Sequence, residues 1–252
     1  MRLMSEYLID RILPRNRIHL IAGISSAGKT RWAIPTLMMF GVSMPVLGLK
    51  SNAVPWGIVC RDRPLADVEE GMAKMRLKMS DLTIIPACGS QSKGYGDIIA
   101  EIRRLKLELV LWEGFDLMVE NINSQGEVQQ FLNQAIAHCE GGLTIIGSTG
   151  VAKLKPHEMY QNPRQLVAGS SVWERMTSTD FINQPIDPAN IEDPRRILYV
   201  SLKNDPSFAV GGKFDHNGVL VFDDYEHRER GAELAKAKGN ERIEVWERLF
   251  KY

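Results

Sequence analysis

The chain has 252 residues, and its hydrophobic and charged fractions of 44% and 25% are those of an ordinary soluble globular protein. Lys plus Arg and Asp plus Glu each total 31, so the zero net charge excludes a nucleic-acid surface spread over the whole molecule and leaves only a local basic patch. The 3 cysteines have neither metal-ligand spacing nor the pattern of a disulfide framework. No apolar stretch is long enough to cross a bilayer, and the N-terminus lacks a signal-peptide pattern. We therefore expect a cytoplasmic protein with no membrane partner.

Hydrophobic periodicity predicts helices and strands in alternation along most of the chain. Residues 5–13 are predicted as a short amphipathic helix that Pro14 ends, and 41–55 as a loop rich in turn residues. Further helices are predicted from Lys29 onward and over about 64–78, 95–105, 126–139 and 224–252. Strands are predicted over 18–22, 57–60, 82–85, 107–112, 143–147, 181–182, 197–202 and 219–222.

This order predicts an α/β fold whose mainly parallel twisted sheet is flanked by helices, with extra antiparallel strands at one edge. We divide the chain into one large domain, 1–223, and a C-terminal helical tail, 224–252. The tail carries an apolar stripe, which indicates either packing on its own domain or docking onto a neighbour or partner protein. The stripe consists of Ile243, Trp246, Leu249 and Phe250.

The segment Gly23–Thr30 matches the phosphate-loop pattern G-x-x-x-x-G-K-[ST], between an apolar strand and a helical pattern. Glycines let backbone N–H groups turn toward phosphates, and the N-terminal end of the following helix attracts them. In such a loop Lys29 contacts the β- and γ-phosphates, and Thr30 offers its hydroxyl to Mg²⁺. We therefore predict a site for ATP and Mg²⁺. The expected nucleotide contacts are Gly23, Ser25, Ser26, Ala27, Gly28, Lys29, Thr30 and Arg31.

An ATPase of this type also needs acids at the ends of neighbouring strands. Glu113 directly follows an apolar strand and is the predicted partner of Mg²⁺, with Asp116 in reserve. Asp62 ends the second strand and is predicted to prepare the attacking water. Each acid also has an ordinary alternative as a helix cap, and Asp62 has arginines beside it for a salt bridge. Polar Ser148 and Thr149 end the next strand, where they either sense the γ-phosphate or satisfy a turn.

In their order along the chain, these motifs resemble the RecA-like P-loop ATPases of the plasmid RepA-type and DnaB-type hexameric replicative helicase group, phage versions included. Asp62-Arg63-Pro64 stands where that group carries its catalytic Glu, and Leu109–Glu113 stands where its strand ends in the Mg²⁺-associated Asp. Other matching segments are 5–23, 149–153, 167–172 and 203–205. The resemblance implies a RecA-like core, ATP hydrolysis, Mg²⁺ and a homo-oligomeric ring, expected to be a hexamer.

Three departures from the group's pattern bear on activity. Asp62 and Glu113 exchange the usual acids, which changes the reach of each carboxylate by one methylene. The His of the group's sensor turn is absent. The position of the trans-acting Arg holds Asp205, so Lys203 is the catalytic candidate there, and it lacks the bidentate fork of an arginine. Either another Arg substitutes, with Arg195 and Arg196 as candidates, or hydrolysis is weak.

A polar loop between residues 153 and 164 occupies the position of the loop that faces the central channel in the helicase group. Basic side chains there are expected to follow a phosphate backbone, and an aromatic ring is expected to stack on a base. The candidate nucleic-acid residues are Lys153, Lys155, Tyr160 and Arg164. A solvated surface loop is the alternative, because loops are normally polar.

The leading hypothesis is an Mg²⁺- and ATP-dependent, ring-forming motor on single-stranded DNA. The rival is a weakly hydrolysing nucleotide switch that loads or regulates a replication or recombination protein, and the missing Arg at position 205 favours it. A small-molecule kinase with the same phosphate loop is a third hypothesis, which rests on fold analogy alone.

Overall fold

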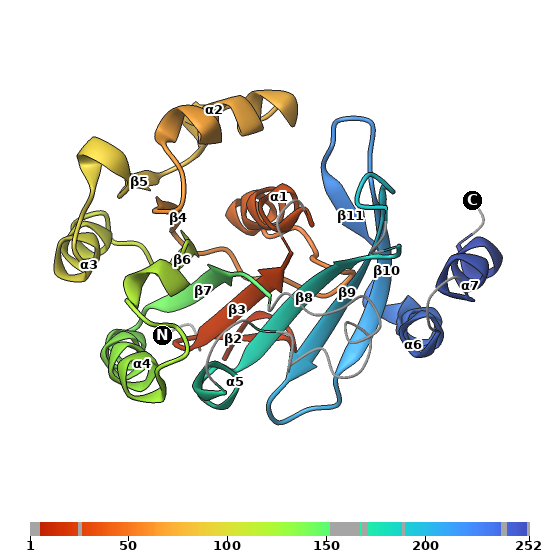
Figure 1. Cartoon of the computed structure of the whole chain (residues 1–252). Helices are drawn as coiled ribbons and strands as arrows, with labels where there is room; N and C mark the ends of the chain where they lie inside the picture. Colours follow the sequence, from red (N-terminus) through yellow and green to blue (C-terminus); the bar gives the residue numbers. More distant parts are fainter. Residues whose placement is uncertain are drawn as a thin grey trace.

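A nine-stranded sheet forms the centre of the protein (Figure 1). The computed structural model describes residues 6–24, 27–151, 167, 171–187, 190–237 and 241–250. The strand order is β11-β10-β9-β8-β3-β7-β6-β4-β5. The strands are β3 (Ile18–Gly23), β4 (Trp56–Cys60), β5 (Ile84–Pro86), β6 (Leu109–Glu113), β7 (Thr144–Thr149), β8 (Thr179–Pro185), β9 (Arg195–Leu202), β10 (Phe208–Phe214) and β11 (Leu220–Phe222).

The pairing within this sheet confirms the predicted fold class. The six strands β5, β4, β6, β7, β3 and β8 are parallel to one another. Strands β9, β10 and β11 add antiparallel pairs at one edge. Because β3 pairs with both β7 and β8, its carboxyl end lies in the middle of the sheet, where open α/β sheets bind ligands.

Helices cover both faces of the sheet, and each face has its own apolar core. One core packs α1 and α2 against the sheet, and the other packs α3, α4, α5, α6 and α7. The helices are α1 (Lys29–Gly41), α2 (Leu65–Lys74), α3 (Tyr95–Arg104), α4 (Gln125–Glu140), α5 (Val172–Met176), α6 (Arg228–Lys236) and α7 (Glu241–Leu249). In the described part of the chain, none of these helices has the length and apolar character that a membrane crossing requires.

The predicted helix over 5–13 is wrong, because these residues form a hairpin of β1 (Tyr7–Ile9) and β2 (Leu13–Pro14). Arg11 adopts a positive φ of 68°, which an α-helix excludes. The backbone N–H of Asp10 donates to the Lys50 carbonyl oxygen at 3.0 Å. The hairpin therefore uses a backbone partner that is distant in the sequence. The same apolar residues that suggested a helix fill the core beside α1.

In the second half of the chain two elements were not predicted, and one predicted helix proved to be two helices. Strand β10 was not predicted, since Gly211 and Gly212 interrupt its apolar pattern. The short helix α5 was also missed. The single helix expected over 224–252 is two helices, α6 and α7. Figure 1 shows both of them beside β10 at the antiparallel edge.

The apolar stripe of the tail packs on its own chain. Trp246 and Phe250 are 6% exposed each and stack at 4.4 Å between ring centroids. Both rings lie so close to Gly211 that a Cβ there would be 2.6 Å from Phe250 and 2.8 Å from Trp246. The structure therefore supports the first of the two interpretations of the stripe. The division at residue 223 stays a prediction.

The contact between α6 and β10 leads to a stability prediction. A Cβ on Gly231 would lie 1.9 Å from the Ala209 carbonyl oxygen, so the helix must move away from the strand. We expect Gly231→Ala to lower the free energy of unfolding by about 3 kcal/mol, the upper end of overpacking costs. Urea denaturation measures this, with Gly71→Ala as the matched control. Gly71 is also helical but has nothing within 4 Å, so that variant should gain about 0.5–1 kcal/mol. Equal effects of the two variants would contradict the close contact.

Candidate nucleotide site

The phosphate loop joins β3 to α1 at the carboxyl end of the central strand. Gly23 has no room for a side chain, because a Cβ would lie 2.8 Å from the Asn183 carbonyl oxygen. Gly28 has a φ of +91° and packs against Phe214, so both its conformation and its surroundings require glycine. Ser25 and Ser26 lie outside the described residues. Strand, loop and helix follow one another as the motif predicts.

Lys29 begins α1 and folds back across the loop. Its Nζ donates to the carbonyl oxygens of Gly23 at 2.8 Å and Ile24 at 3.3 Å. Burial lowers the pKa of Lys29, whereas the negative charges of Asp116, Asp62 and Glu113 oppose that shift. The ammonium group is therefore held at the loop by neutral carbonyls. Phosphate oxygens, which carry charge, are stronger acceptors for it.

Strands β8 and β9 hold the loop from the other side. The Asn183 side-chain amide donates to the Ala27 carbonyl oxygen at 2.6 Å, and Arg196 Nε donates to the same oxygen at 3.3 Å. Arg196 is 2% exposed, and its other nitrogens donate to the carbonyl oxygens of Ile191, Asp193 and Arg195. Sequence reasoning missed Asn183. The sequence of β8, TDFINQP, carries no local signal for it, because Asn183 is one of several polar residues in this strand.

An aromatic ring covers the outer part of the loop. Phe214 ends β10, and the guanidinium of Arg196 lies over it at 4.8 Å from the ring centroid. Arg31, a predicted nucleotide contact, is exposed and lies over the same ring at 5.3 Å. Both distances are within the reach of a cation–π contact. Phe214 is a second residue of this site that the sequence did not reveal.

Thr30 and Glu113 meet next to the loop. The Thr30 hydroxyl donates to Glu113 Oε1 at 2.6 Å, which joins the start of α1 to the end of β6. Glu113 is 1% exposed, and Arg63 pairs with it. Arg63 Nε donates to Oε2 at 3.1 Å, and Nη2 donates to Oε1 at 2.5 Å and to the Thr30 oxygen at 2.9 Å. Burial opposes the charge of Arg63, but Glu113 outweighs it, so the pKa of Arg63 is raised.

The pair formed by Thr30 and Glu113 fits a magnesium ion in its chemistry. A hydroxyl and a carboxylate are the hard oxygen donors that Mg²⁺ takes, and it obtains its other ligands from phosphates and water. Among the described residues, no three His, Cys, Asp or Glu side chains gather as a protein-only metal site.

The remaining strand-end acids take different places. Asp62 lines the same cavity as Lys29 and Thr30, and partial burial, followed by the charge of Glu113, raises its pKa. Asp116, the reserve candidate for the metal, begins a 3₁₀ turn and accepts hydrogen bonds from the Thr149 hydroxyl at 2.9 Å and the Gly150 N–H at 3.3 Å. Asp116 therefore ties down the end of β7. Of the two metal candidates, Glu113 is the one that contacts Thr30.

The loop opens onto a cavity of about 650 Å³. This volume is in the range of small-molecule sites, roughly 300–1,000 Å³. Its lining combines the phosphate loop with Asp62, Arg63, Ser148, Ile191, Glu192, Pro194, Arg196 and Phe214. A larger cleft of about 1050 Å³ lies at the amino ends of the parallel strands, lined among others by Arg17, Glu108 and Leu143. The phosphate loop is absent from that cleft, so the smaller cavity is the candidate site.

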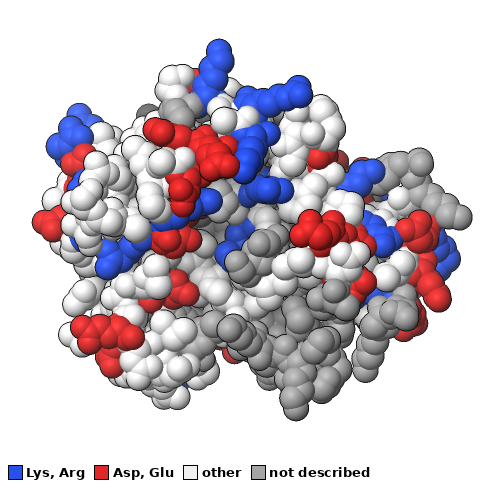
Figure 2. Space-filling model, turned by 45° about the horizontal axis from the view of Figure 1, so that its top comes forward, with Lys and Arg blue, Asp and Glu red and all other residues white. Residues whose placement is uncertain are grey.

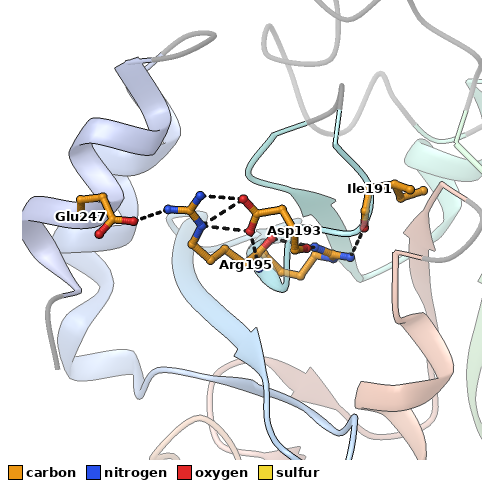
Figure 3. Close-up of polar contacts among 5 residues, drawn as sticks. Ile191, Asp193, Arg195 and Glu247 are labelled. Carbon is orange, nitrogen blue, oxygen red and sulfur yellow. Dashed lines mark hydrogen bonds and ion pairs between the residues drawn. The ribbon is translucent and has the colours of Figure 1, made fainter.

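The candidate arginine substitutes are already engaged. Arg195 pairs with Asp193 at 2.6 Å and with Glu247 at 2.5 Å, so it links the start of β9 to α7 (Figure 3). Arg196 supports the phosphate loop, as described above. Lys203 follows the other end of β9, where its Nζ donates to the Arg175 carbonyl oxygen at 2.9 Å. Within one chain Lys203 is thus at the opposite end of the sheet from the loop, and its role in a neighbouring subunit's site stays a prediction.

The predicted nucleic-acid residues Lys153, Lys155, Tyr160 and Arg164 lie outside the described residues. On the face drawn in Figure 2, acidic and basic side chains of the described part are interspersed. The described residues therefore form no broad basic surface on this face, and the nucleic-acid site stays a prediction.

Fold and site together define a RecA-like α/β protein with a phosphate loop at the carboxyl end of its central strand. No protein-family model and no curated protein matches the sequence. Among solved structures, the chain is similar to a KaiC-like protein from the hyperthermophilic archaeon Pyrococcus horikoshii OT3. The TM-score is 0.55 at 14% sequence identity, and the match covers 85% of this chain and 93% of the archaeal one. The likeness concerns the fold.

Proposed function

We propose that this protein binds Mg²⁺·ATP and hydrolyses it as a ring-forming motor on single-stranded DNA. The observation that carries the nucleotide part is the convergence of Lys29, Thr30 and Glu113 at the carboxyl ends of β3 and β6, beside a cavity of about 650 Å³. Phosphate-binding loops place a lysine and a hydroxyl in this way. The DNA and ring parts rest on the order of motifs in the sequence.

Each side chain has a distinct task in this proposal. Lys29 and the backbone N–H groups of the loop neutralise the phosphates, and Thr30 with Glu113 would hold Mg²⁺, which supplies charge neutralisation at the γ-phosphate. Asp62 in the lining of the cavity orients and deprotonates the attacking water, and its raised pKa makes it a better proton acceptor than an ordinary Asp. Arg196 and Asn183 keep the loop in place through Ala27.

A nucleotide switch is the second candidate, and one observation favours it. Arg195 is committed to Asp193 and Glu247, and Arg196 to backbone carbonyls, so neither is available as an arginine finger without breaking these contacts. An arginine finger contributes about 10³–10⁵ in rate, and without one turnover would be slow. Such a protein would signal through nucleotide binding to a replication or recombination partner.

Steady-state ATP hydrolysis with and without single-stranded DNA separates the two functions. The motor predicts turnover that rises with DNA and is lost in Lys29→Ala. If the three basic residues of the 153–164 loop contact phosphates, DNA affinity should fall roughly 20-fold between 50 and 200 mM salt. Salt-insensitive DNA binding would contradict that loop assignment. Tight nucleotide binding with little turnover, whether or not DNA is present, would reject the motor and support the switch.

A further inference from the structure

Arg63 lies where the metal of a nucleotide site is expected. Its guanidinium bonds both carboxylate oxygens of Glu113 and the hydroxyl oxygen of Thr30, the two side chains that would hold the ion. Glu113 is 1% exposed, and a buried carboxylate without a counter-charge is costly. Arg63 thus supplies the positive charge that this pocket needs in the metal-free protein.

The backbone around Arg63 directs the side chain to this position. Pro64 precedes α2 with a φ of −61°, and the residue before a proline is restricted to extended conformations. The Arg61 N–H donates to the Glu113 carbonyl oxygen at 3.3 Å, which ties the loop to the end of β6. Gly114, with φ +69°, allows close approach, since a Cβ there would be 3.0 Å from Asp62. The ends of β4 and β6 therefore hold Arg63 and Glu113 next to each other.

The guanidinium and a divalent cation cannot share this place. Mg²⁺ binds oxygen at about 2.1 Å. Arg63 Nη2 is 2.9 Å from the Thr30 hydroxyl oxygen, so an ion bound to that oxygen would lie within about 5 Å of Nη2. Two like charges at that distance repel each other strongly where solvent is scarce. The Arg63 side chain is 28% exposed and lines the nucleotide cavity, so it has a path out of the pocket.

We propose that Arg63 is an internal cation that occupies the metal position in the nucleotide-free protein and is exchanged for Mg²⁺ when Mg²⁺·nucleotide binds. The inference rests on the proposed nucleotide binding and adds a competition to it. Each binding event must break the pair between Arg63 and Glu113 before the metal takes Thr30 and Glu113. The released guanidinium then stays at the cavity, where the phosphates attract it. Arg63 therefore raises the half-saturating Mg²⁺ concentration for nucleotide binding.

Equilibrium binding of a fluorescent, non-hydrolysable ATP analogue tests this exchange in the full-length protein. Mg²⁺ is titrated from an EDTA-treated start at constant ionic strength, and the half-saturating concentration is read for wild type, Arg63→Gln and Arg63→Lys. We expect Arg63→Gln to lower that concentration at least about tenfold, because one charge-assisted pair no longer has to be broken. Arg63→Lys keeps the charge without the bidentate fork and should lie between the two.

Arg61→Gln is the matched control. It removes a positive charge from the same loop, but the Arg61 guanidinium donates to the carbonyl oxygens of Ala87 and Lys93, away from Glu113. Its half-saturating Mg²⁺ concentration should equal that of wild type. An unchanged or higher value in both Arg63 variants, with nucleotide still bound, would overturn the exchange alone. If wild type fails to bind the analogue at any Mg²⁺ concentration, the proposed function is wrong and the exchange with it.

Discussion

Replacing Lys29 with alanine is expected to weaken nucleotide binding and slow ATP turnover while leaving the fold intact. The ammonium group bonds only the Gly23 and Ile24 carbonyl oxygens among the hydrogen bonds described for it, and those belong to the loop itself. Its loss removes the ammonium group that the loop holds at the expected phosphate position. ATP turnover should fall about 10²–10³-fold, as when one preorganised donor is removed from a transition state. Isothermal titration with Mg²⁺·ATP and steady-state hydrolysis measure the two effects.

Lys203→Ala is the matched control for Lys29→Ala. It also removes a lysine side chain, but at the end of the sheet away from the phosphate loop, where Lys203 Nζ contacts the Arg175 carbonyl oxygen. Nucleotide affinity should be unchanged. If Lys203 serves a neighbouring subunit, turnover should fall while affinity stays, and the loss should depend on assembly. A Lys29→Ala protein that binds and hydrolyses ATP like wild type would refute the assignment of the phosphate loop.

Arg196→Met is expected to weaken the protein and its nucleotide site together. The guanidinium is almost fully buried and donates to carbonyl oxygens of the loop and of the turn before β9. Hydrogen bonds from a charged donor contribute about 1.5–3 kcal/mol each, offset by the cost of burying the charge, which also lowers the pKa of Arg196. We expect a loss of about 3 kcal/mol in the free energy of unfolding. Guanidinium denaturation checks this value.

The same substitution at the neighbouring residue is the control. Arg195 is more exposed, at 19% of its side chain, and it pairs with exposed Glu247 as well as with Asp193, whose side chain is 8% exposed. Arg195→Met should cost about 1–3 kcal/mol, because it leaves the buried Asp193 carboxylate without its side-chain partner. Of the two variants, Arg196→Met alone should also weaken nucleotide binding, because Arg196, unlike Arg195, donates to the Ala27 carbonyl oxygen. Equal losses of nucleotide affinity in both variants would show that Arg196 has no special role at the loop.

The phosphate loop and the acid at the end of β6 were predictable because their signals are local. Gly23, Gly28, Lys29 and Thr30 lie within one short segment, 23–30, and phosphate binding requires these residue types at this spacing. Glu113 follows directly after an apolar strand, and in a parallel sheet the carboxyl ends of strands meet at one edge. Alternating strands and helices likewise predicted the α/β class, since a parallel sheet buries both faces.

The tertiary structure alone decided what surrounds the loop. The residues Thr30 and Glu113 are 83 positions apart in the sequence, and Asn183 and Ala27 are 156 apart. Sequence patterns are local, so they do not predict which residues meet over such separations. The N-terminal hairpin was mistaken for a helix, because its apolar residues satisfy both periods. Backbone contacts with residues distant in the sequence, among them Lys50 and Asn52, select the strand. From the sequence, Arg63 was interpreted only as a candidate salt-bridge partner of Asp62. Its place on Glu113 follows from packing two strand ends together, where a buried carboxylate must find a cation.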